Sequence, residues 1–314
     1  MAIQTVGIVG AGQMGNGIAH VFALSGYDVL MNDVSAESLS KALATIDRNI
    51  ERQVSRGKVT SEAKAAAMAR IKTSLTIADL GSCDLIIEAA TEKESVKDAI
   101  FKALVPHLAA GTILTSNTSS ISITRLASRT DRPEKFMGFH FMNPVPVMQL
   151  VELIRGIATD QATWDSLHEV VARLGKTAAS AEDFPAFIVN RILMPMINEA
   201  VYTLYEGVGS VKSIDESLKL GGQPSDGAVR TGRFHRARHL PSHHERAARG
   251  LGRYQIPPLP PFDQICRGGL AGTQNSTWVL RLPRRCAGAD ALNAGVSNPR
   301  TRRKSGGFTP PHPP

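Results

Sequence analysis

The chain has 314 residues, of which 42% are apolar, and its formal net charge is +8. That length leaves room for two domains and a substantial core, while no apolar run approaches the ~20 residues that would span a bilayer. The cysteines number three and lack metal-ligand spacing, which argues against a disulfide framework and a metal site. Because no cleavable signal precedes the first predicted strand, we expect a cytoplasmic protein without membrane or metal partners.

The first half of the chain alternates predicted strands and helices. Residues 3–10 are apolar and β-branched, typical of a buried parallel strand, and 13–24 have helical spacing that Gly26 closes. Further strands are expected at 27–31, 84–89, 112–116 and 136–141, and further helices at 36–56, 60–70, 95–108 and 165–174. This alternation predicts an α/β fold, a Rossmann-type doubly wound parallel sheet with right-handed crossovers.

A glycine-rich loop follows the first predicted strand. Gly10, Gly12 and Gly15 form a GxGxxG pattern, which permits a tight turn, close approach to a pyrophosphate and close packing of helix on strand. Asp33 stands 18 residues past Gly15, at the end of the second predicted strand. An acid there accepts hydrogen bonds from ribose hydroxyls and repels a 2′-phosphate. The pattern therefore predicts a dinucleotide site that prefers NAD to NADP.

Polar residues later in this region are candidates for catalysis. The SNTSS run at 116–120 follows an apolar strand, where ligands gather at an open sheet, although an ordinary polar turn has the same composition. His140 and Glu152 lie twelve residues apart, and a carboxylate held against a histidine fixes its tautomer and raises its basicity. Each residue alone is equally compatible with structural hydrogen bonding. Beside a bound nicotinamide, the pair could take a hydroxyl proton while hydride leaves the adjacent carbon.

No strand is predicted after Pro185. Residues 186–204 and 211–220 have helical patterns, and Asn190 lies in an apolar helix where its amide needs a partner. We predict a nucleotide-binding domain at 1–185 and the start of an all-helical second domain at 186–221.

The last third of the chain differs in charge from the rest. Residues 222–314 hold 15 Lys and Arg against four acids, which leaves 21 basic and 24 acidic residues in 1–221. A basic nucleic-acid arm is one interpretation, and PPLPP at 257–261 could mimic a polyproline ligand. We favour a disordered, out-of-frame tail that truncates the helical domain, because 222–314 has no helical or strand periodicity. Dropping one nucleotide near Leu220–Gly222 lets the codons of GGQPSDGAV read ANHPMGP.

Several segments together resemble the 3-hydroxyacyl-CoA dehydrogenase family, and most closely its short 3-hydroxybutyryl-CoA dehydrogenase branch. They are GAGQMG, Asp33, IIEAATE, SNTSS, HFMNPVPVMQLVE and FIVNRILMPMINEA, and they cover 1–221 almost continuously. The resemblance implies NAD-dependent interconversion of (S)-3-hydroxybutyryl-CoA and acetoacetyl-CoA, in fatty acid or butanoate metabolism. It implies a homodimer for an intact member. The helices that would form that interface and close the acyl-CoA cleft follow Gly221, so we do not assign a dimer to this chain.

The resemblance also implies roles for single residues. His140 would be the general base towards the 3-hydroxyl, with Glu152 as its orienting partner, and Ser119 and Asn190 would hydrogen-bond the reacting oxygen. The NAD site would be lined by Gly10, Gly12, Gly15, Asp33, Glu92, Lys97 and Asn117. Family members usually have glycine where this chain has Ala186, a change expected to tighten the hinge between the domains.

A second hypothesis belongs to a different class. The chain could be a catalytically silent NAD-binding or structural protein on the same fold. The intact set of Ser119, His140, Glu152 and Asn190 argues against it, and turnover of acetoacetyl-CoA with NADH would separate the two.

Overall fold

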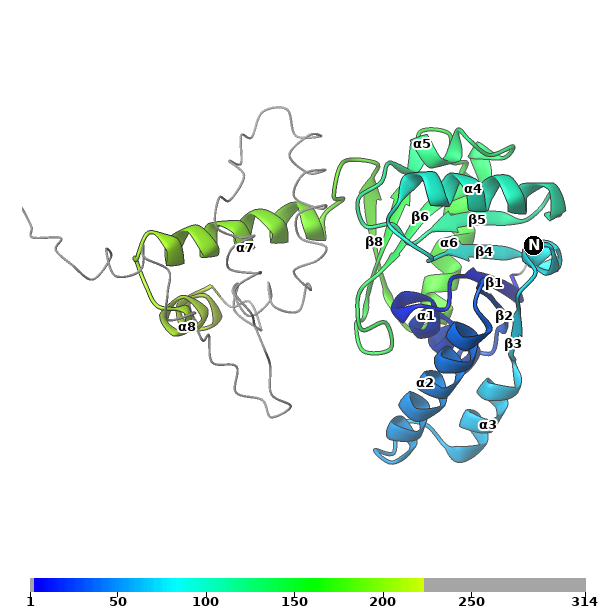
Figure 1. The fold of residues 1–314 in the computed structure, drawn as a ribbon, viewed down its shortest axis with the longest axis horizontal. Coiled ribbons are helices and arrows are strands. Elements are labelled where there is room, and N and C mark those ends of the chain that lie inside the picture. The colour runs from blue at the N-terminus through cyan, green and yellow to red at the C-terminus, as the bar shows by residue number, and fades with distance from the viewer. Residues whose placement is uncertain (1–2, 223–314) are drawn as a thin grey trace, which may run out of the picture. The chain divides into compact units, whose positions relative to one another are not determined.

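A mixed sheet organises the residues that the computed structural model describes, 3–222 (Figure 1). Its strands run in the order β3-β2-β1-β4-β5-β6-β7-β8. All neighbours are parallel except β6 and β7, which are antiparallel. The strands are β1 (Thr5–Val9), β2 (Asp28–Asn32), β3 (Ile71–Ser74), β4 (Leu85–Glu88), β5 (Ile113–Ser116), β6 (Phe136–Phe141), β7 (Leu150–Arg155) and β8 (Thr177–Glu182).

Helices connect these strands and then continue alone. The α-helices are α1 (Gln13–Leu24), α2 (Ala36–Val54), α3 (Ser61–Ala69), α4 (Glu94–Leu104), α5 (Ile123–Ala127), α6 (Gln161–Arg173), α7 (Val189–Tyr205) and α8 (Val211–Gly221). Short 3-10 turns occur at η1 (Ile77–Ser82), η2 (Val105–His107) and η3 (Pro133–Lys135). The predicted helix at 13–24 and strand at 136–141 are confirmed to the residue, and the hydroxyl of Ser35 caps α2 by accepting from the Ser38 N–H at 3.2 Å.

The core lies on both faces of the sheet because successive strand residues point to opposite sides. In β4, Leu85 and Ile87 pack in the cluster that contains α1, α2 and α6 residues, whereas Ile86 packs in the cluster that contains α4 and α5 residues. Figure 1 shows α1, α2 and α3 together, away from α4 and α5. The doubly wound arrangement predicted from the sequence is therefore confirmed.

The prediction of a wholly parallel sheet is wrong beyond β6. Strands β3, β7 and β8 and the short helix α5 were not predicted, and α6 begins at Gln161 rather than at 165. The small side chains of TAASAE in β8 and the mostly exposed IKTS of β3 give no apolar signal, because both strands lie at sheet edges. The start of α6 is set by Asp160, whose carboxylate accepts from the Thr163 N–H at 2.7 Å.

The predicted helices after Pro185 are confirmed as α7 and α8. The two pack on each other through Ala200 and Ile214. Several large apolar side chains of this region are exposed, among them Ile192, Val208 and Leu220. Apart from Gly222, the predicted tail at 222–314 lies outside the described residues, so its frameshift and its disorder stay predictions, as does a basic nucleic-acid arm.

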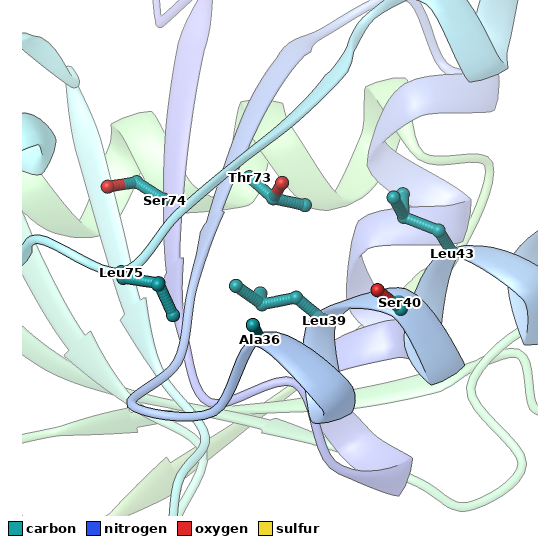
Figure 2. A pocket seen from close by; sticks show the side chains of 7 residues that line it. All are labelled: Ala36, Leu39, Ser40, Leu43, Thr73, Ser74 and Leu75. Atoms are coloured by element: carbon teal, nitrogen blue, oxygen red, sulfur yellow. The ribbon is translucent and has the colours of Figure 1, made fainter.

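Two further observations concern binding. Within 3–222, no helix is long and apolar enough to cross a membrane, and no group of three or more His, Cys, Asp or Glu in this part could hold a metal. A cavity of about 390 Å³ lies between the start of α2 and the end of β3 (Figure 2). None of the predicted site residues lines it; its walls are Ala36, Leu39, Ser40, Leu43, Thr73, Ser74 and Leu75.

Candidate active site

The glycine-rich loop joins β1 to α1 and is shaped by two close approaches. Gly10 has φ +101°, and a Cβ there would lie 2.7 Å from the Cα of Ala90. A Cβ on Gly15 would lie 1.8 Å from the carbonyl oxygen of Gly10. At Gly12, by contrast, no described atom beyond its chain neighbours lies within 4 Å of the Cβ position. Protein packing thus requires Gly10 and Gly15, while the backbone at Gly12 is open to a ligand, as a pyrophosphate cradle requires.

The start of α1 suits an anion. Gly12 is its N-cap without a side-chain hydrogen bond, and the first turn holds no acidic residue. Free N–H groups and the positive end of the helix dipole therefore face this loop. Asp33 lies beside it and accepts from the N–H groups of Ala11 at 2.8 Å and Ser35 at 3.0 Å. The residues present fit a dinucleotide with its ribose near Asp33.

His140 and Glu152 face each other across the antiparallel strands β6 and β7. They are register partners in β6 and β7, and the His140 Nδ1 lies 2.7 Å from the Glu152 Oε2. Both are buried, with His140 6% and Glu152 0% exposed. The chain turns back between β6 and β7, so two residues twelve positions apart become neighbours on the same face of the sheet.

Glu152 is held as a carboxylate. Burial acts to raise its pKa, but hydrogen bonds from His140 and from the N–H groups of Val189 and Ile188 outweigh burial, so the pKa of Glu152 lies below its ordinary value. Its Oε1 accepts these two amides at 2.9 and 3.1 Å, at the start of α7, which has no side-chain cap of its own. Glu152 therefore binds both the imidazole and the start of α7.

The connection between β6 and β7 is fixed to the rest of the site. The Lys176 ammonium donates to the carbonyl oxygens of Val145 and Met148 at 2.8 and 2.7 Å. The Gln13 amide donates to the Asn143 side-chain oxygen at 3.1 Å, which links the glycine loop to this connection. The dyad and the predicted cofactor loop are therefore held as one unit.

Ser119 is bonded to Glu92 rather than exposed as a free hydroxyl. Its N–H and Oγ lie 2.6 and 2.5 Å from the Glu92 Oε1, and the Thr118 hydroxyl donates to Oε2 at 2.8 Å. Burial acts to raise the pKa of Glu92, but the charge of Lys97 and these hydrogen bonds outweigh burial. The pKa of Glu92 therefore lies below its ordinary value, which favours the charged form. A carboxylate only accepts hydrogen bonds, so the Ser119 hydroxyl donates its proton to Glu92.

Lys97 lies in a buried ion pair that the sequence did not reveal. It is 1% exposed, and its Nζ lies 2.5 Å from the Glu88 Oε2 but 4.0 Å from the Glu92 Oε2. Glu88 is fully buried and also accepts from the Ser116 hydroxyl at 2.7 Å and the Ala90 N–H at 2.9 Å. Glu88 therefore positions Lys97, although only the IIEAATE motif that contains it stood out in the sequence.

The two predicted asparagines occupy different places. The Asn117 Oδ1 accepts from the Phe141 N–H at 2.8 Å, which ties the end of β5 to the end of β6. The Asn190 amide lies 3.5 Å from the carbonyl oxygen of Ser119, a long contact that still brings these predicted oxygen ligands together. The predicted site residues come from several kinds of element. Gly10, Gly12, Asp33, Glu92, Asn117 and Ser119 lie in the segments that follow β1, β2, β4 and β5, Gly15 and Lys97 lie in α1 and α4, His140 and Glu152 lie in β6 and β7, and Asn190 lies at the start of α7.

Ala186 occupies the backbone conformation that favours glycine. Its φ is +66° and that of Phe187 is +52°. The left-handed region costs an L-residue roughly 1–2 kcal/mol, while glycine adds about 0.4–1 kcal/mol of unfolded-state entropy. We expect Ala186→Gly to raise the free energy of unfolding by about 0.5–1 kcal/mol, measured by urea denaturation.

Ala66→Gly is the matched control, because Ala66 is exposed in helix α3. It should lower the free energy of unfolding by about 0.5–1 kcal/mol. Equal losses in the two variants would show that the left-handed backbone at residue 186 carries no strain.

Comparisons with known proteins agree with the geometry. Residues 5–184 match the family model described as "3-hydroxyacyl-CoA dehydrogenase, NAD binding domain", and 187–275 match "3-hydroxyacyl-CoA dehydrogenase, C-terminal domain". The chain is 63% identical over 219 residues to the 3-hydroxybutyryl-CoA dehydrogenase of Bradyrhizobium diazoefficiens, covering 70% of this chain and 75% of that protein. It is 40% identical over 226 residues to the human mitochondrial hydroxyacyl-coenzyme A dehydrogenase, covering 70% and 72%. The structure of (S)-3-hydroxybutyryl-CoA dehydrogenase from Ralstonia eutropha superposes with a TM-score of 0.82 at 41% identity, covering 86% of this chain and 95% of that one.

Proposed function

The chain belongs to the 3-hydroxyacyl-CoA dehydrogenase family, an NAD-dependent oxidoreductase family, and from that premise we propose that it interconverts (S)-3-hydroxybutyryl-CoA and acetoacetyl-CoA. The observation that carries the proposal is the buried His140–Glu152 contact of 2.7 Å, in a site that also includes the glycine loop. The names of the relatives support a short acyl-CoA as the substrate.

The dyad would supply the acid–base chemistry. With the Nδ1 hydrogen donated to the Glu152 carboxylate, the lone pair of neutral imidazole is on Nε2. His140 Nε2 would take the proton of the 3-hydroxyl as carbon 3 loses a hydride and becomes the ketone carbon. In the reverse direction, protonated His140 returns that proton, and Glu152 stabilises the imidazolium in both directions.

The cofactor would be held by the glycine loop and its neighbours. We assign Gly10, Gly12, Gly15 and Asp33 to the adenosine and pyrophosphate end, and Glu92, Lys97 and Asn117 to the remainder. Bound NAD supplies the hydride acceptor. The open backbone at Gly12 and the uncapped start of α1 support this assignment.

Ser119 and Asn190 would stabilise the reacting oxygen. Hydrogen-bond donors aimed at that oxygen act more strongly as it gains negative charge. The Ser119 hydroxyl donates to Glu92 at 2.5 Å, so we propose that it turns from Glu92 to the substrate when the acyl-CoA binds. Asn190 lies beside it, with its amide 3.5 Å from the Ser119 carbonyl oxygen.

Turnover by the full chain tests the proposed function. Acetoacetyl-CoA should cause oxidation of NADH, measured by the loss of its absorbance, and the product should be the thioester (S)-3-hydroxybutyryl-CoA. NADH binding without any turnover would instead support the catalytically silent NAD-binding protein, since that hypothesis keeps the fold and loses the reaction.

Asp33 makes a separate prediction about cofactor choice. Its carboxylate would face the ribose and repel a 2′-phosphate, so the wild-type chain should bind NADH more tightly than NADPH. Asp33→Asn keeps one acceptor oxygen but removes the charge, and should narrow the ratio of the two dissociation constants by about tenfold or more, since like charges in contact cost several kcal/mol. Titrations of nucleotide fluorescence give both constants. If the ratio of the NADPH and NADH dissociation constants stayed unchanged, Asp33 would not be the residue that discriminates between the two nucleotides.

A further inference from the structure

We propose that Asp183 is a positioning residue of the active site, which fixes the segment that carries Ser119 to the segment that carries Phe187 and the start of α7. The inference rests on the proposed function for its kinetic consequence, but its structural content stands on the contacts of Asp183. Asp183 itself touches neither dyad residue.

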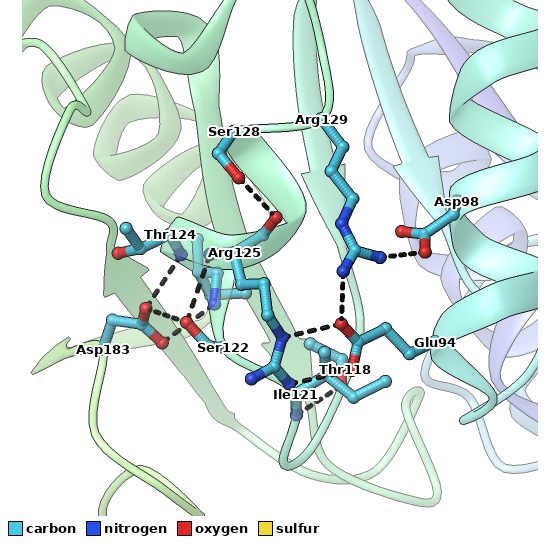
Figure 3. Close-up of polar contacts among 11 residues, drawn as sticks. Glu94, Asp98, Thr118, Ile121, Ser122, Thr124, Arg125, Ser128, Arg129 and Asp183 are labelled. Carbon is cyan, nitrogen blue, oxygen red and sulfur yellow. Dashed lines mark hydrogen bonds and ion pairs between the residues drawn. The ribbon is translucent and has the colours of Figure 1, made fainter.

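Asp183 accepts three hydrogen bonds from one short stretch of chain. Its Oδ2 accepts from the Ser122 hydroxyl at 2.7 Å and the Thr124 N–H at 2.8 Å (Figure 3). Its Oδ1 accepts from the Ile123 N–H at 2.8 Å. Ser122 in turn accepts from the Arg125 N–H at 3.2 Å. The residues that follow Ser119 are therefore held on the end of β8, because both oxygens of one carboxylate are used.

The chain on the other side of Asp183 leads directly to the dyad. The Phe187 ring lies with its centroid 5.9 Å from that of His140, and the next amides, of Ile188 and Val189, donate to Glu152. The turn between is tight, since the Phe187 N–H donates to the Phe184 carbonyl oxygen at 3.0 Å. Such a short connection transmits a displacement of Asp183 to the ring that packs on His140.

The other contacts of the Ser119 segment do not replace Asp183. On its outer side, Arg125 makes a two-point ion pair with Glu94, at 2.6 and 2.8 Å, but this pair attaches the segment to α4 and not to the chain that follows β8. On its inner side, Glu92 holds Ser119, and that contact must open if Ser119 is to reach the substrate. The Asn190 amide also reaches the Ser119 carbonyl oxygen, but at 3.5 Å, so the three short hydrogen bonds of Asp183 are the stronger attachment of this segment to the chain that leads into α7.

Asp183→Asn tests the inference in the full chain. An isosteric amide places an NH2 group against at least one backbone N–H that the carboxylate accepted, so this attachment weakens while the shape stays. By hydrogen exchange, we expect the amides at 187–191 to exchange about tenfold faster than in the wild type, together with those at 122–125. Unchanged exchange at 187–191 would overturn the inference, even if 122–125 exchanged faster.

Asp160→Asn is the matched control, because Asp160 accepts a backbone N–H in the same way at the start of α6. It should speed exchange only near 161–164, with kcat unchanged. In Asp183→Asn, kcat should fall about 10–100-fold, since a small misplacement of catalytic groups has effects of this size, while the Kd for NADH stays at the wild-type value. A wild-type kcat in Asp183→Asn would overturn the positioning role.

The test of Asp183 still decides its role if the wild-type chain shows no turnover or if Asp183→Asn does not fold. A wild-type chain without turnover would remove the proposed function, while the exchange measurement would still decide the role of Asp183. If Asp183→Asn does not fold, Ser122→Ala removes one of the three donors; faster exchange at 187–191 in that variant would support the inference, and unchanged exchange would overturn it.

Discussion

His140→Gln should lower kcat for acetoacetyl-CoA reduction by about 10²–10⁴-fold, the range for a positioned general acid–base group. The glutamine side chain keeps polar atoms beside Glu152, but it cannot exchange a proton near neutral pH. The Kd for NADH should remain at the wild-type value, because the predicted cofactor residues lie on the glycine loop and on the segments after β2, β4 and β5. Steady-state rates and fluorescence titration measure the two quantities separately.

His107→Gln is the matched control for this change. His107 is exposed in the turn η2, so its loss should leave kcat unaltered. Equal rates for His140→Gln and the wild type would exclude His140 as the base. A loss of NADH binding in His140→Gln would instead mean that the variant disturbs the cofactor site.

Glu88→Gln should lower the free energy of unfolding by about 3–5 kcal/mol, the usual cost of removing one partner from a buried ion pair. Lys97 would remain in the core with Glu92 as its nearest acid, 4.0 Å away. Because typical domains unfold with about 5–15 kcal/mol, the loss should be plain in urea denaturation.

Glu51→Gln provides the comparison, since Glu51 pairs with Lys64 at 2.8 Å while its side chain is 60% exposed. An exposed pair should contribute about 0–1 kcal/mol. If Glu88→Gln were no more destabilising than Glu51→Gln, Glu92 or water would have to satisfy Lys97, and the buried pair would not hold the site together.

The sequence predicted the nucleotide-binding part of the fold because its strands are buried on both faces. The apolar runs of β1, β4, β5 and β6 follow directly from that burial, and the cap at Ser35 sets the start of α2. The cap at Asp160 was not predicted, so the start of α6 was placed too late. Strands β3 and β8 could not be found in this way. Their residues lie at sheet edges, where neither face demands apolar side chains.

The site shows a different limit. The spacing of His140 and Glu152 pointed to a pair, but the antiparallel strand that creates the pair was hidden inside a segment interpreted as a motif. Glu88 and Asp183 were missed because their roles depend on long-range contacts with Lys97 and with the start of α5. Sequence patterns report which side chain can do chemistry, whereas the residues that position it appear only once distant segments meet.

The hydrogen-bond partner of Ser119 could not be predicted from the sequence either. A serine near the reacting oxygen was expected to donate its proton there, and in the structure that proton goes to Glu92. The difference arises because Glu92, 27 residues earlier in the chain, follows β4 at the same sheet edge. For Ser119 to take part in catalysis, its hydroxyl would therefore have to leave Glu92 and donate to the substrate oxygen instead.

The distance from the His140 Nε2 to the 3-oxygen of acetoacetyl-CoA, measured in a crystal of the full chain with NAD and this ligand, tests the central claim most directly. We predict roughly 2.6–3.2 Å, the hydrogen-bond range required of a general acid–base group, with Glu152 still on Nδ1. A ligand oxygen bound by other side chains, with His140 beyond hydrogen-bond reach, would contradict the assignment of the dyad.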